Sequence, residues 1–248
     1  MPEAFSLPNL LARCGVSKRF MNADLSEFSA YCQKIGKTGE SLFAHGPRGT
    51  GKTHFLCACL SMAVQKKLKA GELNIESLVT TQKPPVKFLP APELLLEFKQ
   101  SYEPNSPMSE ADILKKYSAV DLLVLDDLGV ERVSHWSIQV LYLLIDRRYR
   151  DMKATMISSN LRPSEIAAKF DDRIASRICE MCHQVKFSAS LCGTQACEVI
   201  GGFSQRQTAK EIGVSQPRVR AIILKAENPF SLLTLPRRIT TILGGRSA

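Results

Sequence analysis

The sequence predicts an α/β fold in three layers, in which helices cover both faces of a mainly parallel sheet and a small all-helical module follows. Short apolar runs alternate with longer stretches whose apolar residues recur at helical spacing. The runs show no polar alternation, as expected of strands that are buried on both faces. After Phe187 this pattern stops, and short helical stretches, glycines and basic residues follow.

The first strand is expected at residues 41–46, because the apolar run SLFAHG ends in a glycine turn. The next helix, 52–70, has apolar residues at helical spacing, and three lysines precede Gly71 at its end. Basic side chains followed by a glycine are typical of a helix end. The same patterns place later strands at 86–89, 121–125, 154–158 and 184–187, and later helices at 92–102, 109–117, 134–149, 164–170 and 172–181.

The composition is that of an ordinary globular protein with excess positive charge. The 248 residues include 33 Lys+Arg and 24 Asp+Glu, for a formal net charge of +9. This excess suggests an acidic partner: nucleic acid, a membrane surface or a phosphate-bearing ligand. No apolar stretch approaches the roughly 20 residues that cross a bilayer, and no secretory signal pattern opens the chain. We therefore expect a cytoplasmic protein whose cysteines are structural thiols rather than disulfides or zinc ligands.

A glycine-rich segment, GPRGTGKT, joins the first strand to the helix after it and fits G-x-x-x-x-G-K-[ST]. Glycines let successive backbone N–H groups turn inward around phosphates, and the helix N-terminus adds a favourable dipole. Lys52 is expected to reach the β- and γ-phosphates of ATP, and the Thr53 hydroxyl to bind Mg²⁺. The predicted nucleotide-binding residues are Gly46, Pro47, Arg48, Gly49, Thr50, Gly51, Lys52 and Thr53.

An acidic pair, Asp126 and Asp127, follows the third apolar strand in the segment VDLLVLDDLG. The carboxyl ends of parallel strands are where ligand sites form. Asp126 is predicted to hold Mg²⁺ through water, and Asp127 to orient or deprotonate the attacking water. The alternative is a pair of capping or turn aspartates. The phosphate loop upstream weakens that alternative, because a nucleotide site needs a metal ligand.

A C-terminal segment, residues 205–224 (QRQTAKEIGVSQPRVRAIIL), fits the spacing of a helix-turn-helix. Ala209 is small enough for two helices to cross closely, and Gly213 stands at the turn. Gln216, Arg218 and Arg220 are then predicted to face the major groove of DNA or its phosphates. The segment resembles the helix-turn-helix units of bacterial regulators and sigma factors. The alternative is an ordinary helical hairpin that serves as a lid or an oligomer contact.

The net charge is concentrated in the same part of the chain. Residues 188–248 hold eight basic and three acidic residues, so a quarter of the chain carries more than half of the +9. This distribution favours DNA over a membrane as the acidic partner.

Five segments form an ordered set of motifs. They are GPRGTGKT at 46–53, LVLDDLG at 123–129, WSIQVLYLLIDRRY at 136–149, TMISSNL at 155–161 and DDRIASRI at 171–178. The set resembles the AAA+ ATPases and, within them, the DnaC-type helicase loaders and the IstB-type transposition helper ATPases, over about residues 10–187. The resemblance implies a P-loop fold of the AAA+ (ASCE) type and a homo-oligomer. It also implies ATP-dependent work on DNA with a replicative helicase or a transposase.

The resemblance assigns roles to further residues. Asn160 matches the sensor-1 polar residue, which contacts the γ-phosphate or the attacking water. Arg177 matches the arginine finger, which completes a neighbouring subunit's site, and Arg173 is a weaker candidate for that role. The alternative for both arginines is a solvated helix face with local aspartate partners. Three lysines, Lys99, Lys115 and Lys116, lie where related initiators and loaders carry a DNA-contacting insertion, although a solvated charged face is at least equally expected there.

We expect three parts: an N-terminal segment at 1–40, an ATP-binding domain at 41–187, and a helix-turn-helix module with its tail at 188–248. The leading hypothesis is an ATP-hydrolysing replication protein that loads or remodels a replicative helicase. The alternatives are a transposition helper ATPase and an ATP-switched DNA-binding regulator or replication initiator.

Overall fold

The computed structural model describes residues 7–28, 30–37, 39–71, 85–131, 133–188 and 197–198. The predicted helix-turn-helix, with Gln216, Arg218 and Arg220, lies outside the described residues and stays a prediction. Within the described residues, no helix is both long enough and apolar enough to span a membrane.

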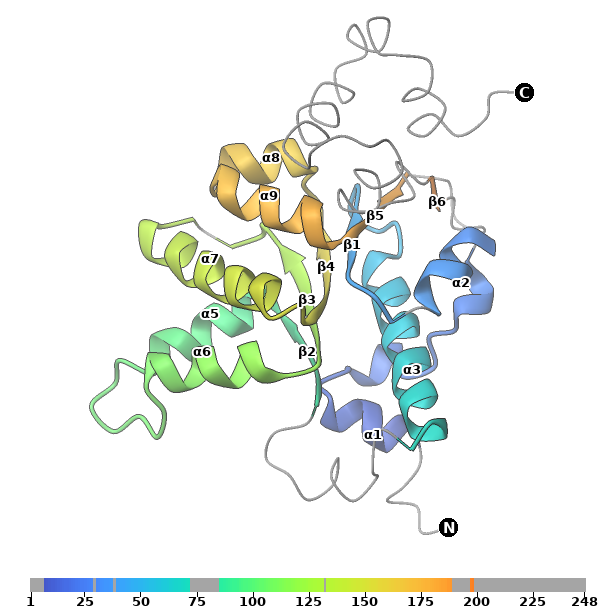
Figure 1. The fold of residues 1–248 in the computed structure, drawn as a ribbon, viewed down its shortest axis with the longest axis horizontal. Coiled ribbons are helices and arrows are strands. Elements are labelled where there is room, and N and C mark those ends of the chain that lie inside the picture. Colours follow the sequence, from blue (N-terminus) through green and yellow to red (C-terminus); the bar gives the residue numbers. More distant parts are fainter. Residues whose placement is uncertain are drawn as a thin grey trace, which may run out of the picture.

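A six-stranded sheet forms the centre of the described chain, in the order β2-β3-β4-β1-β5-β6 (Figure 1). The first five of these run parallel, and β6 pairs antiparallel with β5. The strands are β1 Leu42–His45, β2 Val86–Pro90, β3 Leu122–Leu128, β4 Ala154–Ser159, β5 His183–Phe187 and β6 Cys197–Glu198. The predicted parallel sheet is confirmed. Because β1 lies between β4 and β5, the loop after β1 emerges in the middle of the carboxyl edge of the sheet.

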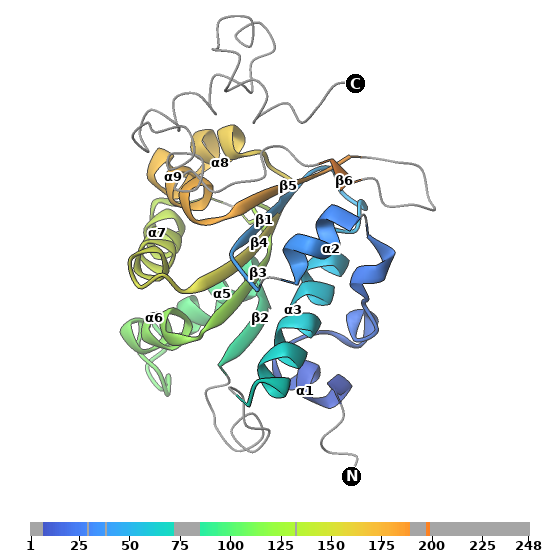
Figure 2. The same ribbon diagram turned by 45° about the vertical axis from the view of Figure 1, so that its right-hand side comes forward.

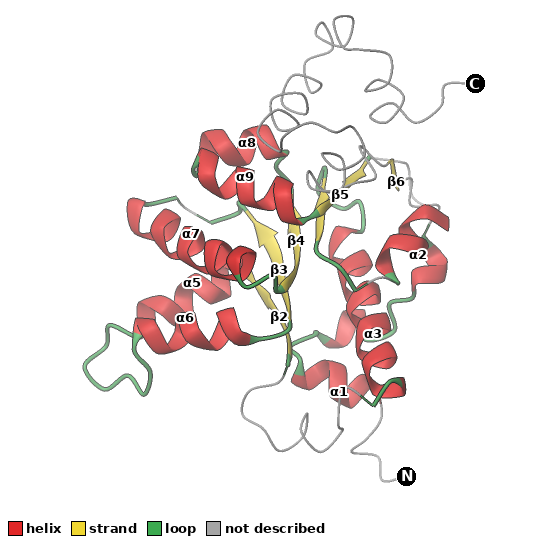
Figure 3. Cartoon of the chain, viewed as in Figure 1, coloured by secondary structure: helices red, strands yellow, loops and turns green. Residues whose placement is uncertain are grey.

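Helices cover both faces of the sheet, which confirms the predicted three layers (Figures 2 and 3). The helices, including two short 3₁₀ turns, are α1 Leu7–Arg13, η2 Lys18–Phe20, η3 Leu25–Glu27, α2 Ala30–Gly36, α3 Lys52–Lys69, α5 Ala91–Gln100, α6 Glu110–Ala119, α7 His135–Arg150, α8 Pro163–Lys169 and α9 Asp172–Met181. On β1, Leu42 and Ala44 join the core under α1 and α3, whereas Phe43 joins the core under α5–α9. Alternate side chains therefore point to opposite buried faces, which explains the continuous apolar strand sequence.

The segment before β1 packs into the same core as α3. Leu10, Cys14, Leu25 and Phe28 are buried in that cluster. The sequence pattern indicated none of these elements, because helices of seven residues are too short to show a periodicity.

Strand β3 corrects one predicted boundary. The expected end at Leu125 is wrong, because the strand continues to Leu128 and so contains both aspartates. Its pairing with β4 shifts register between Leu125 and Leu128. A β-bulge of this kind accommodates one extra residue and re-aims side chains, which a residue-by-residue strand propensity does not capture.

The six cysteines whose side chains are described are buried free thiols: Cys14, Cys32, Cys57, Cys59, Cys179 and Cys182. Burial raises the pKa of the Cys14 thiol to about 11, so this thiol stays protonated near neutral pH. Such thiols fill core volume and are chemically inert.

Candidate functional site

The carboxyl edge of the sheet brings three predicted segments together. The phosphate loop follows β1, the two aspartates end β3, and Asn160 follows β4 directly. β4 lies between β3 and β1 in the sheet, so Asn160 lies between the aspartates and the loop. Ligand sites of parallel sheets form at this edge.

The phosphate loop takes a backbone shape that requires its glycines. Gly46, Gly49 and Gly51 all have positive φ angles, of 148°, 76° and 88°. A Cβ at Gly46 would lie 2.1 Å from the carbonyl oxygen of Phe187, so only glycine fits there. Helix α3 begins at Lys52, and its N-cap Gly51 supplies no side-chain cap. The first N–H groups of α3 are therefore available to an anion.

Lys52 is a buried cation held by neutral oxygens. Its side chain Nζ donates to Gly46 O at 2.9 Å, to Pro47 O at 2.7 Å and to Asn160 Oδ1 at 2.9 Å. The residue is only 5% exposed, and burial lowers the pKa of its ammonium group. A buried cation without a bonded anion is costly, so a phosphate that reaches this ammonium gains a strong charge-assisted bond.

Asp126 is held by a hydrogen bond from Thr53. Thr53 Oγ1 donates within 3.0 Å of both carboxylate oxygens of Asp126. Burial raises the pKa of Asp126, an effect that hydrogen bonds from Ser158 and Thr53 partly offset. The two side chains offer a hydroxyl and a carboxylate, the hard oxygen donors that Mg²⁺ prefers alongside water and phosphate oxygens. The donor set therefore fits Mg²⁺.

Asp127 is one of two non-glycine residues with a positive φ among the described residues, at 56°. Its N–H donates to Ser158 Oγ at 2.8 Å, and its side chain lines an open cleft of about 670 Å³ above the phosphate loop. A strained backbone at a cleft is typical of a functional residue. Ser158 lies in the motif TMISSNL, but only Asn160 was given a role there.

The cleft also contains residues that sequence reasoning missed. Arg19 and Phe20, from the 3₁₀ turn η2, line it together with His54 of α3 and Val130. The Arg19 guanidinium lies 5.7 Å from the centre of the Phe20 ring, and that ring meets His54 edge-on at 6.2 Å. A three-residue turn is too short to show a sequence periodicity, so the pattern could not have indicated that η2 lines the cleft.

The two arginines of DDRIASR lie on α9 and are not among the described residues that line this cleft. Arg177 Nε donates to Asp146 Oδ1 at 3.2 Å, and its guanidinium stacks 4.4 Å from the centre of the Tyr149 ring. Arg173 pairs with Asp171 at 2.9 Å and stacks 4.7 Å from the centre of the Tyr142 ring. Both arginines therefore pair with local aspartates, as the alternative of a solvated helix face predicts. In addition, each guanidinium packs on a tyrosine ring of α7.

The strand order, the phosphate loop after β1 and the carboxylates on β3 together define the class: a P-loop protein of the AAA+ type. The family model for the IstB-like ATP binding protein matches residues 30–190. The chain belongs to this family of IstB-like ATP-binding proteins.

Known proteins resemble the chain over most of the same region. The replicative helicase loader DnaC of Buchnera aphidicola subsp. Baizongia pistaciae is 22% identical over 190 residues, which cover 71% of each chain. The replicative helicase loader DnaC of Escherichia coli is 26% identical over 159 residues, or 64% of this chain and 57% of that protein. A crystal structure of the DnaC helicase loader matches with a TM-score of 0.53 and 24% identity, covering 68% of this chain and 99% of that one. At this identity the structural match shows the shared fold.

Proposed function

We propose that this chain is an ATPase that works on DNA with a replicative helicase, in the manner of a helicase loader. The observation that carries the proposal is that Lys52, Thr53 and Asn160 line one cleft, with Asp126 bonded to Thr53 behind it. The similarity to proteins named replicative helicase loader supports the choice of partner.

Five of the predicted site residues each have a role in ATP hydrolysis. A phosphate oxygen of ATP replaces one of the neutral acceptors of Lys52, and Asn160 contacts the same phosphate. Thr53 and Asp126 are the residues that would hold Mg²⁺. When bound, this ion neutralises charge that develops on the phosphates. Asp127 orients the attacking water and accepts its proton.

Arg177 acts on a neighbouring copy of the chain in this proposal. Asp146 and Tyr149 of α7 hold its guanidinium, and the side chain is 33% exposed, which leaves it open to a second subunit's γ-phosphate. An arginine supplied in this way stabilises transition-state charge. The chain therefore works as a homo-oligomer, and hydrolysis depends on protein concentration.

An exposed aromatic surface supports contact with DNA through the described residues. It consists of Tyr102, which is 60% exposed, Trp136, whose Nε1 donates to the Tyr102 hydroxyl at 3.0 Å, and Lys99, whose Nζ lies 5.8 Å from the Trp136 ring. The exposed ring of Tyr102, with the partly buried ring of Trp136 and a cation beside it, offers a platform on which unpaired bases stack. Gln216, Arg218 and Arg220 would add contacts to duplex DNA. Replacing Tyr102 with Leu is expected to weaken single-strand binding about tenfold or more, whereas Leu96→Ala, a nearby exposed control, leaves it unchanged.

The deciding experiment measures ATP affinity, ATP hydrolysis and helicase loading for the wild type and for Lys52→Ala. The wild type is expected to bind ATP and to load the replicative helicase of the same organism onto the single-stranded arm of a DNA fork. Lys52→Ala is expected to lose both activities. Undiminished ATP affinity of Lys52→Ala would overturn the site assignment. If the wild type bound and hydrolysed ATP but had no effect on the helicase, the loader role would be overturned and only the ATPase activity would stand.

A transposition helper is the second candidate, because the matching family model carries the IstB name. It differs from a loader in its partner, since the ATPase would then act with a transposase. Co-purification of the chain with a transposase encoded beside it, and not with the helicase, would favour this candidate.

A further inference from the structure

Ser158 lies in the middle of the carboxyl edge, on β4, and its side chain reaches across to β3. The residue is fully buried. Its Oγ donates to Asp126 Oδ1 at 2.5 Å and accepts the N–H of Asp127 at 2.8 Å. One hydroxyl therefore holds the side chain of one predicted site residue and the backbone of the next.

We propose that Ser158 is a positioning residue that sets the geometry of both aspartates for Mg²⁺·ATP. The inference rests on the proposed ATPase function and adds to it a residue to which the motif TMISSNL gave no role. Ser158 touches neither nucleotide nor metal in this role, and it acts only through Asp126 and Asp127.

The hydrogen-bond directions are fixed by the chemistry of the groups. A backbone N–H can only donate, so Ser158 Oγ must accept from Asp127. The single hydroxyl proton is then free for the carboxylate of Asp126, which accepts it. Ser158 is thus donor to one aspartate and acceptor from the other, a combination that alanine, valine and cysteine side chains do not reproduce well.

The bulge in β3 explains why a side chain is needed here. Leu125 pairs with Ile157 and Leu128 pairs with Ser159, so β3 advances three residues while β4 advances two. Asp127 is in the left-handed region within this bulge, and its N–H bonds to a side chain instead of a β4 carbonyl. Ser158 thereby supplies the partner that an unbulged strand would have found in the backbone.

The same contact holds Asp126 from the sheet side. Oδ1 accepts from both Ser158 and Thr53, whereas Oδ2 accepts from Thr53 among the side chains of the described residues. Ser158 thus fixes Oδ1 from the sheet, and Thr53 bonds to both oxygens from the side of the phosphate loop. Without Ser158 only Thr53 among these side chains holds the carboxylate, so its orientation toward the metal is less well defined and the N–H of Asp127 in the bulge loses its partner.

The test uses the full chain in four forms: wild type, Ser158→Ala, Ser158→Thr and the control Ser118→Ala. Ser118 is also a buried serine, but its hydroxyl bonds to Leu114 O within α6. The readouts are the affinity for a fluorescent ATP analogue with Mg²⁺ and with EDTA, and the rate of hydrolysis. If Ser158→Ala does not fold, Ser158→Cys replaces it, because a thiol keeps the volume but donates poorly.

Mg²⁺ is expected to raise the affinity for the ATP analogue in the wild type. In Ser158→Ala this increase is expected to be about 10–100-fold smaller. Affinity in EDTA should stay within about twofold of wild type, because the phosphate loop is intact. Ser158→Thr, which keeps the hydroxyl, should recover most of the loss, and Ser118→Ala should behave as wild type. A folded Ser158→Ala with the wild-type gain from Mg²⁺ overturns this inference alone. A wild type that binds no ATP overturns the proposed function instead.

Discussion

The carboxyl edge and the amino edge of the sheet share two unusual features, a buried cation and a non-glycine residue with a positive φ, but these features have different roles at the two edges. Each edge has a buried cation: Lys52 at the carboxyl edge and Arg148 at the amino edge. Each also has a non-glycine residue with a left-handed backbone, Asp127 with φ 56° and Met152 with φ 52°. Burial and strain therefore do not by themselves mark a functional site. What differs is whether the partners of these groups can be exchanged for a ligand.

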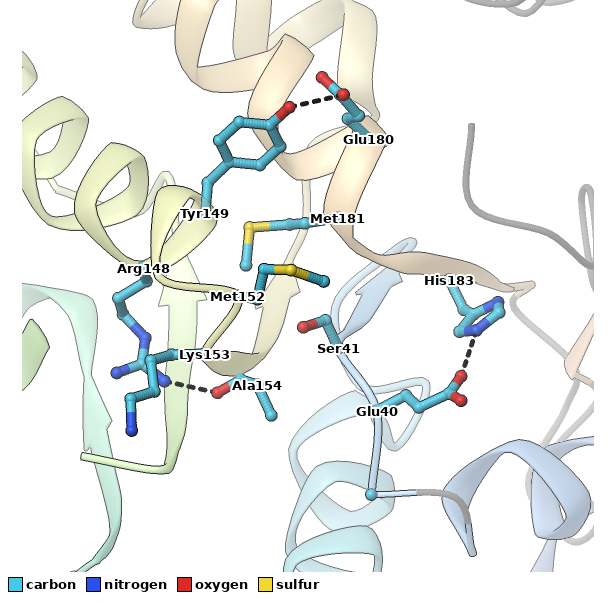
Figure 4. Close-up of a pocket in the computed structure, with 11 residues that line it drawn as sticks. Glu40, Ser41, Arg148, Tyr149, Met152, Lys153, Ala154, Glu180, Met181 and His183 are labelled. Atoms are coloured by element: carbon cyan, nitrogen blue, oxygen red, sulfur yellow. Dashed lines mark hydrogen bonds and ion pairs between the residues drawn. The ribbon is translucent and has the colours of Figure 1, made fainter. Parts of the chain in front are cut away.

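Arg148 has permanent partners. Its guanidinium donates to the carbonyl oxygens of Tyr117, Ser118 and Val120, at 2.9, 3.2 and 2.8 Å. These carbonyls lie at the C-terminal end of α6, where helical hydrogen bonds run out. Arg148 also bonds to Ala154 O at the start of β4 (Figure 4) and to Thr155 Oγ1. It thus fastens a helix end to the sheet, whereas the acceptors of Lys52 lie beside an open cleft.

The amino edge has a hollow as well, of about 340 Å³, between the ends of α7 and α9 (Figure 4). Its polar side chains largely bond to one another: the Tyr149 hydroxyl donates to Glu180 at 2.6 Å, and His183 lies 2.6 Å from Glu40. Groups paired in this way offer a ligand little, although Nδ1 of His183 is buried without a hydrogen-bond partner among the described residues. The comparison predicts that changing Arg148 alters stability, whereas changing Lys52 alters ligand binding.

The largest effect is expected from Arg148→Met. It leaves several buried carbonyls without a donor, so we expect a loss of about 3–5 kcal/mol in the free energy of unfolding. The midpoint of urea unfolding measures this loss. ATP affinity of the folded fraction should be unchanged, and a reduced affinity would break the comparison. Arg148→Lys, which keeps the charge without the forked geometry, should recover only part of the stability.

Acid sensitivity should come from the carboxyl edge. His45 ends β1, is 2% exposed and has both ring nitrogens without a hydrogen-bond partner. Burial, with help from Lys186, Arg162 and Lys52 against the opposing charge of Glu165, lowers its pKa from 6.5 to about 4. The unfolded chain then binds a proton at a higher pH than the folded chain. The stabilisation is complete above pH 6.5 and is lost as the pH falls toward 4.

This loss amounts to about 3 kcal/mol, at about 1.4 kcal/mol for each pKa unit. His45→Phe keeps an aromatic ring against Phe43 and removes the titration. We expect its unfolding free energy to fall less steeply than that of wild type between pH 6.5 and pH 4. Urea unfolding across this range tests the point, and an unchanged slope would assign the acid sensitivity elsewhere.

Lys52→Met should separate binding from stability. The loss of one charge-assisted phosphate contact is expected to weaken ATP binding by about 10–100-fold. The free energy of unfolding of the unliganded protein should change by less than about 1 kcal/mol, because the buried ammonium already bears a desolvation cost that offsets its hydrogen bonds. Calorimetry of ATP binding and urea unfolding measure the two quantities. A loss of stability as large as that of Arg148→Met would make Lys52 a structural cation too.

The sequence predicted the parts of both edges that depend on local pattern. The strands, the glycine loop and the carboxylates follow from residue type and spacing, and the structure brings Lys52, Thr53, Asp126 and Asn160 together as expected. Ser158 could not be found in this way, because a serine inside an apolar strand has no distinctive spacing and acquires its role from the bulge in β3. Arg148 was part of the motif IDRRY, but its burial depends on where α6 ends.

The smallest effect concerns the two strained residues. Met152 follows the C-cap of α7 in the left-handed position that glycine usually takes at a helix end. Met152→Gly should therefore stabilise the chain by about 0.5–1 kcal/mol, with ATP hydrolysis unchanged.

Asp127→Gly relieves the same kind of strain but removes the carboxylate that lines the cleft. It should gain stability and lose hydrolysis, as measured by urea unfolding and phosphate release. If Asp127→Gly kept hydrolysis, its strain would be as incidental as that of Met152, and water activation would have to come from another group.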